Sequence, residues 1–587
     1  MTAEPAPAPR ERPRLRPTQI GIVGSPSGTG DVTIDIVEKA ANETLLGDMV
    51  YTYHPLNEGR YLIALGTVNE IETHNRWHED PNMRGVLRIH GSLPHLSAEG
   101  DVRTANVRVQ AVFESDAPAP PFRRVPTESG GALGMSPTTG AGVNLVDEDL
   151  VQGLIASRRH EVVYLGRVYR SDVRLPMFIR DFASEHTDGA FHTGIFGRTG
   201  SGKTALAAYM LAQQLRHTQM SVFVFDPQGQ FSSENQLPIS PQDAARSYGR
   251  EVIVKSVARD LQLPPSNGLL TELLEQTRFF SLLTIKRADN RQEAIAEIES
   301  ALRDREHWYD HDPEDVLRAL LEHLHEERHL NRVYARGTAQ TRFSDTLEEA
   351  LQGERLWTDL LNEFTRVHAV FNPTGRTKLL SILRQVTDTS RAVKPYVVIN
   401  VAGEQGSDWL DQEDIKARII RTIAFHLRRL ADRSWTESGR SINCSVIFDE
   451  AARFAPSATD GSDAVRALSA QLVENVRETR KVGLGWTFIA QETRAIHEGI
   501  YNQLSIRAYG YGLTSGAEFR RVADDVGATS ADLYRTFANP RALQEKVYPF
   551  MVSGPISPLS FTSAPVFLEV ATSAEQFAAL NRGTDRV

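Results

Sequence analysis

The amino-acid sequence predicts an α/β protein: a parallel sheet with crossover helices, preceded by an all-β barrel and interrupted by a helical insert. After residue 190, apolar runs of strand length alternate with longer helical patterns, as in parallel sheets that are covered on both faces. Before residue 180, the chain holds many short β-type runs separated by turn signals. Between about 265 and 390, the sequence is polar and helical in pattern.

The N-terminal region, residues 18–180, is predicted to form a small barrel or sandwich. A stretch rich in Pro, Gly, Ser and Thr, at about 115–142, is expected to be a long loop within it. The β-type runs of this region are Ile20–Val23, Met49–Tyr53, Tyr61–Leu65, Val86–Ile89 and Val107–Val112.

The parallel sheet is expected in two segments, 181–264 and 391–570, on either side of the insert. Apolar residues recur at helical spacing between Asp414 and Asp432, which predicts a crossover helix there. The strand candidates are His192–Phe196, Ser221–Phe225, Tyr396–Val401, Cys444–Phe448, Gly485–Ala490 and Ile506–Tyr511.

The insert, residues 265–390, contains a well-formed helix start at Asp312-Pro313, where Asp is a good cap and Pro suits the first turn. His325 and His329 share a helical face, with His323 close by. Two such ligands do not complete a zinc site, and cysteine ligands are absent, so a metal site is not favoured.

Composition favours a soluble, cytoplasmic protein. The single cysteine, Cys444, excludes an intramolecular disulfide framework, and no run of about 18 apolar residues predicts a membrane span. Residues 1–17, rich in Pro, Ala and Arg, lack the apolar centre of a signal peptide and are expected to be disordered. Residues 571–587 are expected to be a C-terminal tail. The net charge of −10 argues against a uniformly basic nucleic-acid surface but leaves a local channel open.

One motif points to phosphate chemistry. Residues 197–204 fit the pattern G-x-x-x-x-G-K-[ST], with an apolar strand before them and a helical pattern after them. Glycines allow backbone N–H groups to wrap phosphates, the lysine reaches the β and γ oxygens, and the Thr204 hydroxyl is a ligand for Mg²⁺. The nucleotide-binding candidates are Gly197, Arg198, Thr199, Gly200, Ser201, Gly202, Lys203 and Thr204.

Polar residues at the ends of later strands supply candidate partners. Asp449 is expected near the Mg²⁺ shell, and Glu450 is a candidate for polarising the attacking water. Gln491 ends a further strand and is a candidate sensor of the γ-phosphate or of the lytic water. Asp226, which ends the second strand, belongs to the same carboxyl edge.

Arg480 is the candidate for an arginine supplied to a neighbouring subunit's nucleotide, because such a guanidinium stabilises charge during phosphoryl transfer. Arg477, Lys481 and Arg507 are its rivals.

Taken together, the P-loop, the motifs that begin at Asp226 and Phe448, and the Arg480–Gly483 segment leading to Gln491 resemble the HerA family, relatives of the FtsK DNA pumps. The resemblance implies a HAS-barrel-like N-terminal domain, a RecA-like ATPase core and a helical insert. It also implies ATP and Mg²⁺ as cofactors, a homo-hexameric ring, double-stranded DNA as the substrate, and a NurA-type nuclease as the partner in end resection and repair. Arg480 matches the family's trans-acting arginine.

Three positions, in two motifs, depart from the family pattern. Ala452 stands where the family often has histidine, and Gln228 and Gln230 replace the His and Glu of the usual second-strand motif. Neither departure involves Lys203 or the acidic pair.

Within such a ring, the loop at about 455–466, which follows the acidic pair, is expected to line the central hole. Arg453 and Arg466 are then candidates for contacts with DNA phosphates. Two alternatives stay open: an ATP-binding ring that serves as a scaffold for an antiphage effector enzyme, and a soluble motor of the conjugation or secretion type.

Overall fold

The computed structural model describes residues 18–56, 59–91, 93–118, 123–124, 133–182, 190–233, 236–403, 408–457 and 460–582. The predicted disordered tail, residues 1–17, lies outside the described residues, as does part of the predicted loop at 115–142. The chain divides into two compact units. One is built mainly from residues up to 178 together with 511–571, and the other from residues 179–510.

The first unit contains a closed antiparallel barrel, which confirms the predicted N-terminal fold. Its strands follow one another in the order β2-β1-β7-β3-β4-β5, and pairing of β5 with β2 closes the ring. Their alternating apolar residues fill the interior, among them Ile20, Ile34 and Val107. The strands are β1 (Gln19–Val23), β2 (Asp31–Ile36), β3 (Met49–Pro55), β4 (Tyr61–His74), β5 (Val102–Ser115) and β7 (Gly142–Leu145).

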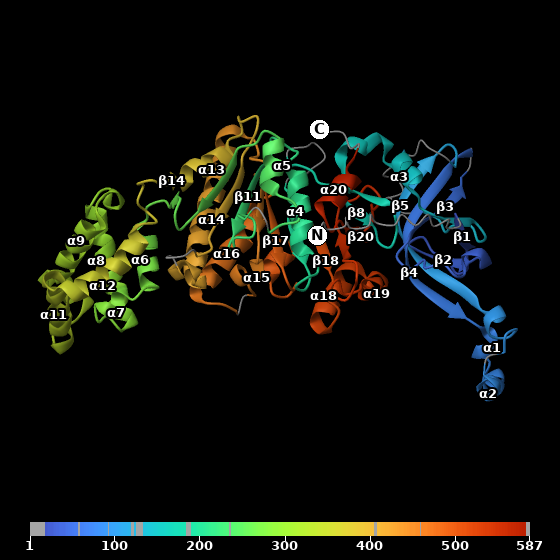
Figure 1. Ribbon diagram of the computed structural model, residues 1–587, viewed down its shortest axis with the longest axis horizontal. Helices are drawn as coiled ribbons and strands as arrows, with labels where there is room; N and C mark the ends of the chain where they lie inside the picture. The colour runs from blue at the N-terminus through green and yellow to red at the C-terminus, as the bar shows by residue number, and fades with distance from the viewer. Residues whose placement is uncertain are drawn as a thin grey trace, which may run out of the picture. The chain divides into compact units, whose positions relative to one another are not determined.

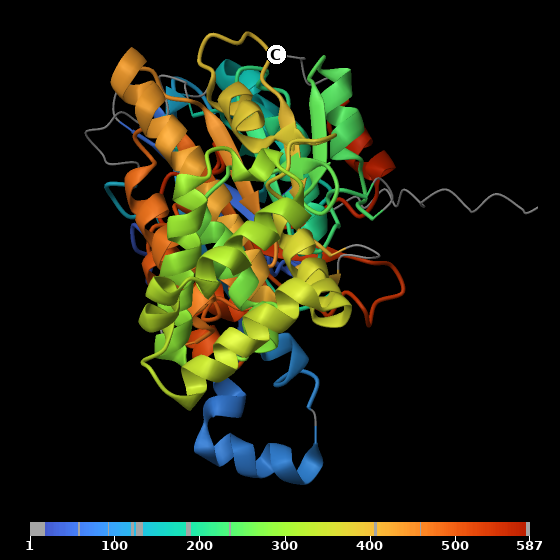
Figure 2. The same cartoon turned by 90° about the vertical axis from the view of Figure 1, so that its left-hand side faces the viewer.

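The prediction of a strand at Val86–Ile89 is wrong, because these residues belong to helix α2 (Pro81–His90). The Asp80 side chain accepts hydrogen bonds from the backbone N–H groups of the second and third helical residues, and Pro81 starts the helix. This Asp-Pro helix start outweighs a short apolar run that has no partner strand. Figures 1 and 2 show α1 (Arg76–Glu79) and α2, in blue, beyond the end of the long β4–β5 hairpin.

Four more strands belong to this unit, although the predicted core segment extended to residue 570. β19 (Tyr548–Ser553), β20 (Val566–Val570), β8 (Val162–Val168) and β9 (Arg174–Phe178) pair in that order, all antiparallel. The chain therefore returns to the first unit after residue 510. Part of the expected tail is also ordered, as helix α20 (Ala574–Leu580), beyond which the Asn581 amide bonds the backbone of Tyr164.

The second unit is built on a parallel sheet in the order β12-β15-β11-β16-β17-β10-β18. All six predicted strands are present. The additional strand, β12, lies at the sheet edge and is partly exposed, and its apolar run is short, Val252–Val254, followed by Lys255 and Ser256. The bounds are β10 (Thr193–Phe196), β11 (Ser221–Asp226), β12 (Val252–Ser256), β15 (Tyr396–Asn400), β16 (Cys444–Phe448), β17 (Leu484–Ala490) and β18 (Ile506–Gly510).

The predicted crossover helix is α14 (Glu413–Ser438), which packs on α16 (Asp463–Glu478). Ile415, Ile419 and Ile423 are fully buried, as their helical spacing predicts. The helix continues to Gly439, whose φ of 65° ends it in the left-handed conformation. Among the described residues, no helix combines the length and apolarity that a membrane crossing needs.

The insert is a bundle of short helices with its own apolar core (green to yellow in Figure 1). Phe279, Ile298, Leu321 and Phe364 are fully buried in it. As predicted, Asp312 caps a helix, accepting from Glu314 N at 2.8 Å. The bundle helices are α6 (Asn267–Glu275), α7 (Phe279–Leu282), α8 (Ala288–Asp304), α9 (Pro313–His325), α10 (Glu327–Val333), α11 (Thr338–Gln352) and α12 (Glu354–His368). Helix α13 (Leu379–Thr387), which also falls within the predicted insert, packs instead on α14 and on β11 of the parallel sheet.

A buried histidine makes the stability of the second unit depend on pH. His192 precedes β10, and its Nδ1 accepts a hydrogen bond from Trp486 N at 3.1 Å. Burial lowers the pKa of His192 from 6.5 to about 4. Because the unfolded chain binds this proton more readily, the stabilisation is present above pH 6.5 and is lost as the pH falls towards 4. The resulting loss in the free energy of unfolding is about 3 kcal/mol at most.

We predict that His192→Asn, which keeps an acceptor for Trp486 N, flattens the pH dependence of the free energy of unfolding between pH 6.5 and 4. Chemical denaturation at a series of pH values measures it. His90→Asn, at an exposed position of α2, is the matched control. An unchanged slope in His192→Asn would show that this histidine does not carry the effect.

Candidate active site

The phosphate-binding candidates form the turn between β10 and helix α4 (Lys203–Gln214). Gly197, Gly200 and Gly202 have φ values of 149°, 86° and 90°. Residues with a Cβ atom rarely adopt such values. A Cβ on Gly197 would also lie 2.6 Å from Ser201 Oγ and 3.2 Å from the backbone of Gly510. The turn is therefore restricted to glycine at these positions, and it leads into the N-terminus of α4, where unbonded N–H groups favour anions.

Lys203 lies over this turn and close to the acidic pair. Its Nζ donates to the carbonyls of Gly197 at 2.7 Å and Arg198 at 3.3 Å. Burial lowers the pKa of Lys203, while the nearby charges of Glu450 and Asp449 act in the opposite direction. The structure therefore brings together the lysine of the P-loop and the carboxylates that follow β16.

Asp449 has the environment of a cation ligand. It is 3% exposed, and its Oδ1 accepts from Glu450 N at 2.9 Å. Within the described part of the chain, its Oδ2 is buried and has no hydrogen-bond partner. Burial, assisted by the charge of Glu450, raises the pKa of Asp449 to about 7. A divalent cation would favour the ionised form of the Asp449 carboxylate and would give its Oδ2 a partner. The environment of Asp449 therefore fits Mg²⁺.

Glu450 has an unusual backbone conformation. Its φ of 50° and ψ of 40° lie in the left-handed region, which residues other than Gly, Asn and Asp seldom occupy. Such strain costs of order 1–3 kcal/mol and is concentrated at functional sites. The conformation begins the short helix α15 (Ala451–Phe454) and turns the chain sharply after β16. Nothing in the sequence indicates this feature.

Gln491 reaches the P-loop because β17 pairs in parallel with β10, with Ala490 opposite Phe196. Thr199 Oγ1 donates to Gln491 Oε1 at 3.3 Å. An amide that bonds the phosphate-binding turn directly is suited to respond to the γ-phosphate.

Arg480 lies at the other end of β17. The seven residues of this strand separate it from Gln491, a distance of roughly 20 Å. Its carbonyl accepts from Ala190 N, which precedes β10. The structure therefore does not bring Arg480 to Lys203 within one chain. Its neighbours Arg477 and Lys481 lie at the same end of β17, whereas the Arg507 guanidinium stacks on the Tyr501 ring at 4.8 Å.

Asp226 shapes a loop at this edge. Its Oδ1 accepts from Gln230 N at 3.0 Å, and its Oδ2 accepts from the Ser232 backbone and hydroxyl at 2.7 and 2.6 Å. The amide of Gln230 bonds that of Gln228 at 2.9 Å, so the two substituted positions pair with each other. Both oxygens of Asp226 are thus occupied by its own loop.

Residues 163–423 match the family model of the central domain of helicase HerA. Among solved structures, VirB4 of Thermoanaerobacter pseudethanolicus is 15% identical, covering 70% of this chain and 97% of that chain, with a TM-score of 0.39. The genome packaging NTPase B204 of Sulfolobus turreted icosahedral virus 2, in complex with AMPPCP, is 11% identical (65% and 98% covered, TM-score 0.28). The pCW3 conjugation coupling protein TcpA is 10% identical (89% and 88% covered, TM-score 0.25). No curated protein matched the chain.

Residues 163–423 are thus a HerA-type central domain, which confirms the resemblance inferred from the motifs. The domain contains the P-loop, and the acidic pair and Gln491 follow it in the same sheet. The chain therefore contains a P-loop ATPase domain of the HerA type.

We predict that two substitutions separate ATP binding from hydrolysis. Lys203→Ala removes the cation that faces the phosphates and is expected to weaken the binding of a fluorescent ATP analogue at least tenfold, about 1.4 kcal/mol. Glu450→Gln keeps the side-chain volume and is expected to retain binding while lowering phosphate release by about 10²-fold or more. Glu349→Gln, at an exposed position of α11, is the control. Hydrolysis by Glu450→Gln at the wild-type rate would exclude a catalytic role for this carboxylate.

Proposed function

We propose that this protein is a DNA translocase that works as a homo-hexameric ring, driven by hydrolysis of Mg²⁺-ATP, with double-stranded DNA as its track. The proposal rests chiefly on one observation. Lys203, the acidic pair and Gln491 converge at the carboxyl edge of the sheet, whereas the candidate arginine lies at the opposite end of β17. The helicase named by the matching family model supports nucleic acid as the substrate.

Within the site, each residue has a proposed role that follows from its position. Thr204 and Asp449 would hold Mg²⁺, which would neutralise phosphate charge. The P-loop N–H groups and Lys203 bind the phosphates, and Lys203 balances the charge that develops on them. Glu450 polarises the attacking water, and Gln491 orients it or reports the presence of the γ-phosphate through its bond to Thr199.

A neighbouring copy is proposed to complete the site. Arg480 is exposed, and roughly the length of β17 separates it from its own chain's P-loop edge. A guanidinium in that position can act only on a nucleotide held by another chain, as arginine fingers do. This requirement for a second copy is the physical basis for the proposed ring.

DNA contacts are proposed for the loop that follows the acidic pair. In this segment, Arg453 pairs with Glu413 at 2.7 Å, and Arg466 donates to Gly461 O at 2.5 Å and also bonds Asp463. Residues 458 and 459 of the expected loop lie outside the described residues. A ring repeats each of these basic groups once per subunit, which allows an acidic chain to hold an anionic track.

The proposed biological setting is DNA end resection and repair together with a NurA-type nuclease, for which the N-terminal barrel would be the docking platform. The support is the presence of a closed barrel followed by a HerA-type central domain.

We predict that linear duplex DNA raises the ATPase rate several-fold and that added salt removes the stimulation, since binding to phosphates releases counterions. Steady-state phosphate release, with and without DNA and the cognate nuclease, measures it. Arg453→Glu and Arg466→Glu are expected to abolish the stimulation and spare nucleotide binding. The matched control is Arg433→Glu, an exposed arginine of α14 that is also ion-paired.

Hydrolysis that is indifferent to DNA in the wild-type protein would reject translocation and favour the ring scaffold. Stimulation that survives both charge reversals would move the DNA contacts to another loop. A rate that responds to DNA but not to the nuclease would remove only the proposed partner.

A further inference from the structure

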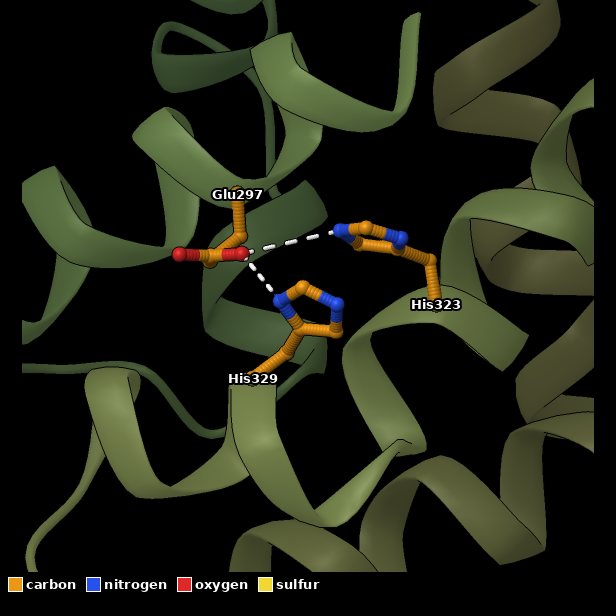
Figure 3. A group of neighbouring side chains, drawn as sticks. All are labelled: Glu297, His323 and His329. Carbon is orange, nitrogen blue, oxygen red and sulfur yellow. Dashed lines mark hydrogen bonds and ion pairs between the residues drawn. The ribbon is translucent and has the colours of Figure 1, made fainter. Parts of the chain in front are cut away.

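Three side chains meet inside the helical insert, outside the ATPase site. Glu297 comes from α8, His323 from α9 and His329 from α10, and Figure 3 shows both imidazoles beside the same carboxylate. One ligand atom from each lies within 4.8 Å of the others. The exposed fractions of the side chains are 3%, 15% and 7%. The three residues form a cluster that is largely withdrawn from solvent.

The two oxygens of Glu297 have different surroundings. Oε1 accepts from Arg332 Nη1 at 2.7 Å. Oε2 bonds His329 Nδ1 and lies 3.6 Å from His323 Nε2. Because Arg332 already balances the carboxylate charge, ion pairing alone does not explain why two imidazoles face the second oxygen.

One nitrogen of each histidine has no hydrogen-bond partner among the described residues. Among the described residues, the Nε2 atoms of His323 and His329 are buried and lack hydrogen-bond partners. The two rings stack, with centroids 3.7 Å apart and planes inclined by 27°. Buried polar atoms normally find a partner, so an unpartnered nitrogen that faces a carboxylate oxygen requires an explanation.

We propose that Glu297, His323 and His329 bind one divalent transition-metal ion, with Zn²⁺ the best fit. Imidazole nitrogen and carboxylate oxygen are established ligands of this ion, at distances of about 2.0–2.2 Å. Ligand atoms at those distances from a tetrahedral ion lie roughly 3.4 Å apart, a spacing close to that of His323 Nε2 and Glu297 Oε2. A water molecule would supply the fourth ligand.

Groups around the cluster are suited to support such an ion. Arg332 fixes the carboxylate through Oε1, and Glu326 Oε2 lies 3.7 Å from His329 Nε2, on the side away from Glu297. Carboxylates behind ligating histidines are common at metal sites and orient the ring. The ion would join three helices of the insert, so its expected effect is to stabilise the bundle rather than to act on ATP.

His325, which the sequence pattern pairs with His329, is not part of the cluster. Its Nε2 bonds the Ser344 hydroxyl at 3.2 Å instead. It therefore offers a matched control: a histidine of the same helix, two residues from His323, with no contact to Glu297.

Zn²⁺ titration of the chelator-stripped, full-length protein without nucleotide tests the proposal, read out by calorimetry and by the unfolding temperature. Wild type is expected to bind one Zn²⁺ per chain and to unfold several degrees higher when loaded. His323→Phe preserves the ring stack but removes the nitrogen, and it is expected to weaken binding at least 100-fold, as is Glu297→Gln. His325→Gln should bind like wild type. The visible absorption of bound Co²⁺ gives a second readout that does not depend on stability.

Absence of stoichiometric Zn²⁺ binding in the folded wild-type protein would overturn the proposal. Equal affinity in wild type and folded His323→Phe would also overturn it, because the ion would then lie elsewhere, for example at Asp449. If His323→Phe does not fold, Glu297→Gln decides the question by the same comparison. None of these results bears on the proposed DNA translocation, which is tested separately by the stimulation of the ATPase rate by DNA.

Discussion

The parallel pairing of β10 with β17 on one side and β18 on the other determines the geometry of the whole ATPase site. Through β17, this pairing brings Gln491 against Thr199 of the P-loop, and through β18 it places the backbone of Gly510 3.2 Å from the position that a Cβ of Gly197 would occupy. β16, on the far side of β17, then delivers the acidic pair to the same edge. The same register places Arg480 at the opposite end of β17, away from the P-loop of its own chain.

The two acidic residues of the site are held in energetically unfavourable states. Asp449 is a buried carboxylate with an unpartnered oxygen and a pKa raised to about 7 by burial, and Glu450 adopts a left-handed backbone conformation. Both features destabilise the protein by itself, and a cation bound at Oδ2 would offset the cost of burying the Asp449 carboxylate. Asp226, at the neighbouring strand end, shows the contrast, since its own loop satisfies both of its oxygens.

Much of the fold could be predicted from the sequence because burial leaves a periodic trace. Apolar runs marked the six central strands, and Ile415, Ile419 and Ile423 marked α14. The apolar run at Val86–Ile89 was wrongly predicted as a strand because Asp80 and Pro81 start a helix there. The edge strand β12 was not predicted because its apolar run, Val252–Val254, is only three residues long. Within the candidate ATPase site, the motifs indicated the residues but not the left-handed conformation of Glu450. In the insert, the meeting of Glu297 with His323 also went unpredicted. Both features depend on tertiary packing, which leaves no local sequence pattern. The roles assigned to the site residues stay predictions.

In the proposed ring, hydrolysis requires Glu450 from one chain and Arg480 from another. Co-expression of Glu450→Gln and Arg480→Ala chains carrying different tags, followed by tandem affinity purification, isolates oligomers that contain both variants. In such oligomers, some interfaces pair an intact Glu450 with an intact Arg480. If both residues are required across an interface, each variant alone is nearly inactive, and the mixed oligomers regain a substantial part of the wild-type ATPase rate. Mixed oligomers as inactive as the separate variants, or a fully active Arg480→Ala protein, would contradict this requirement.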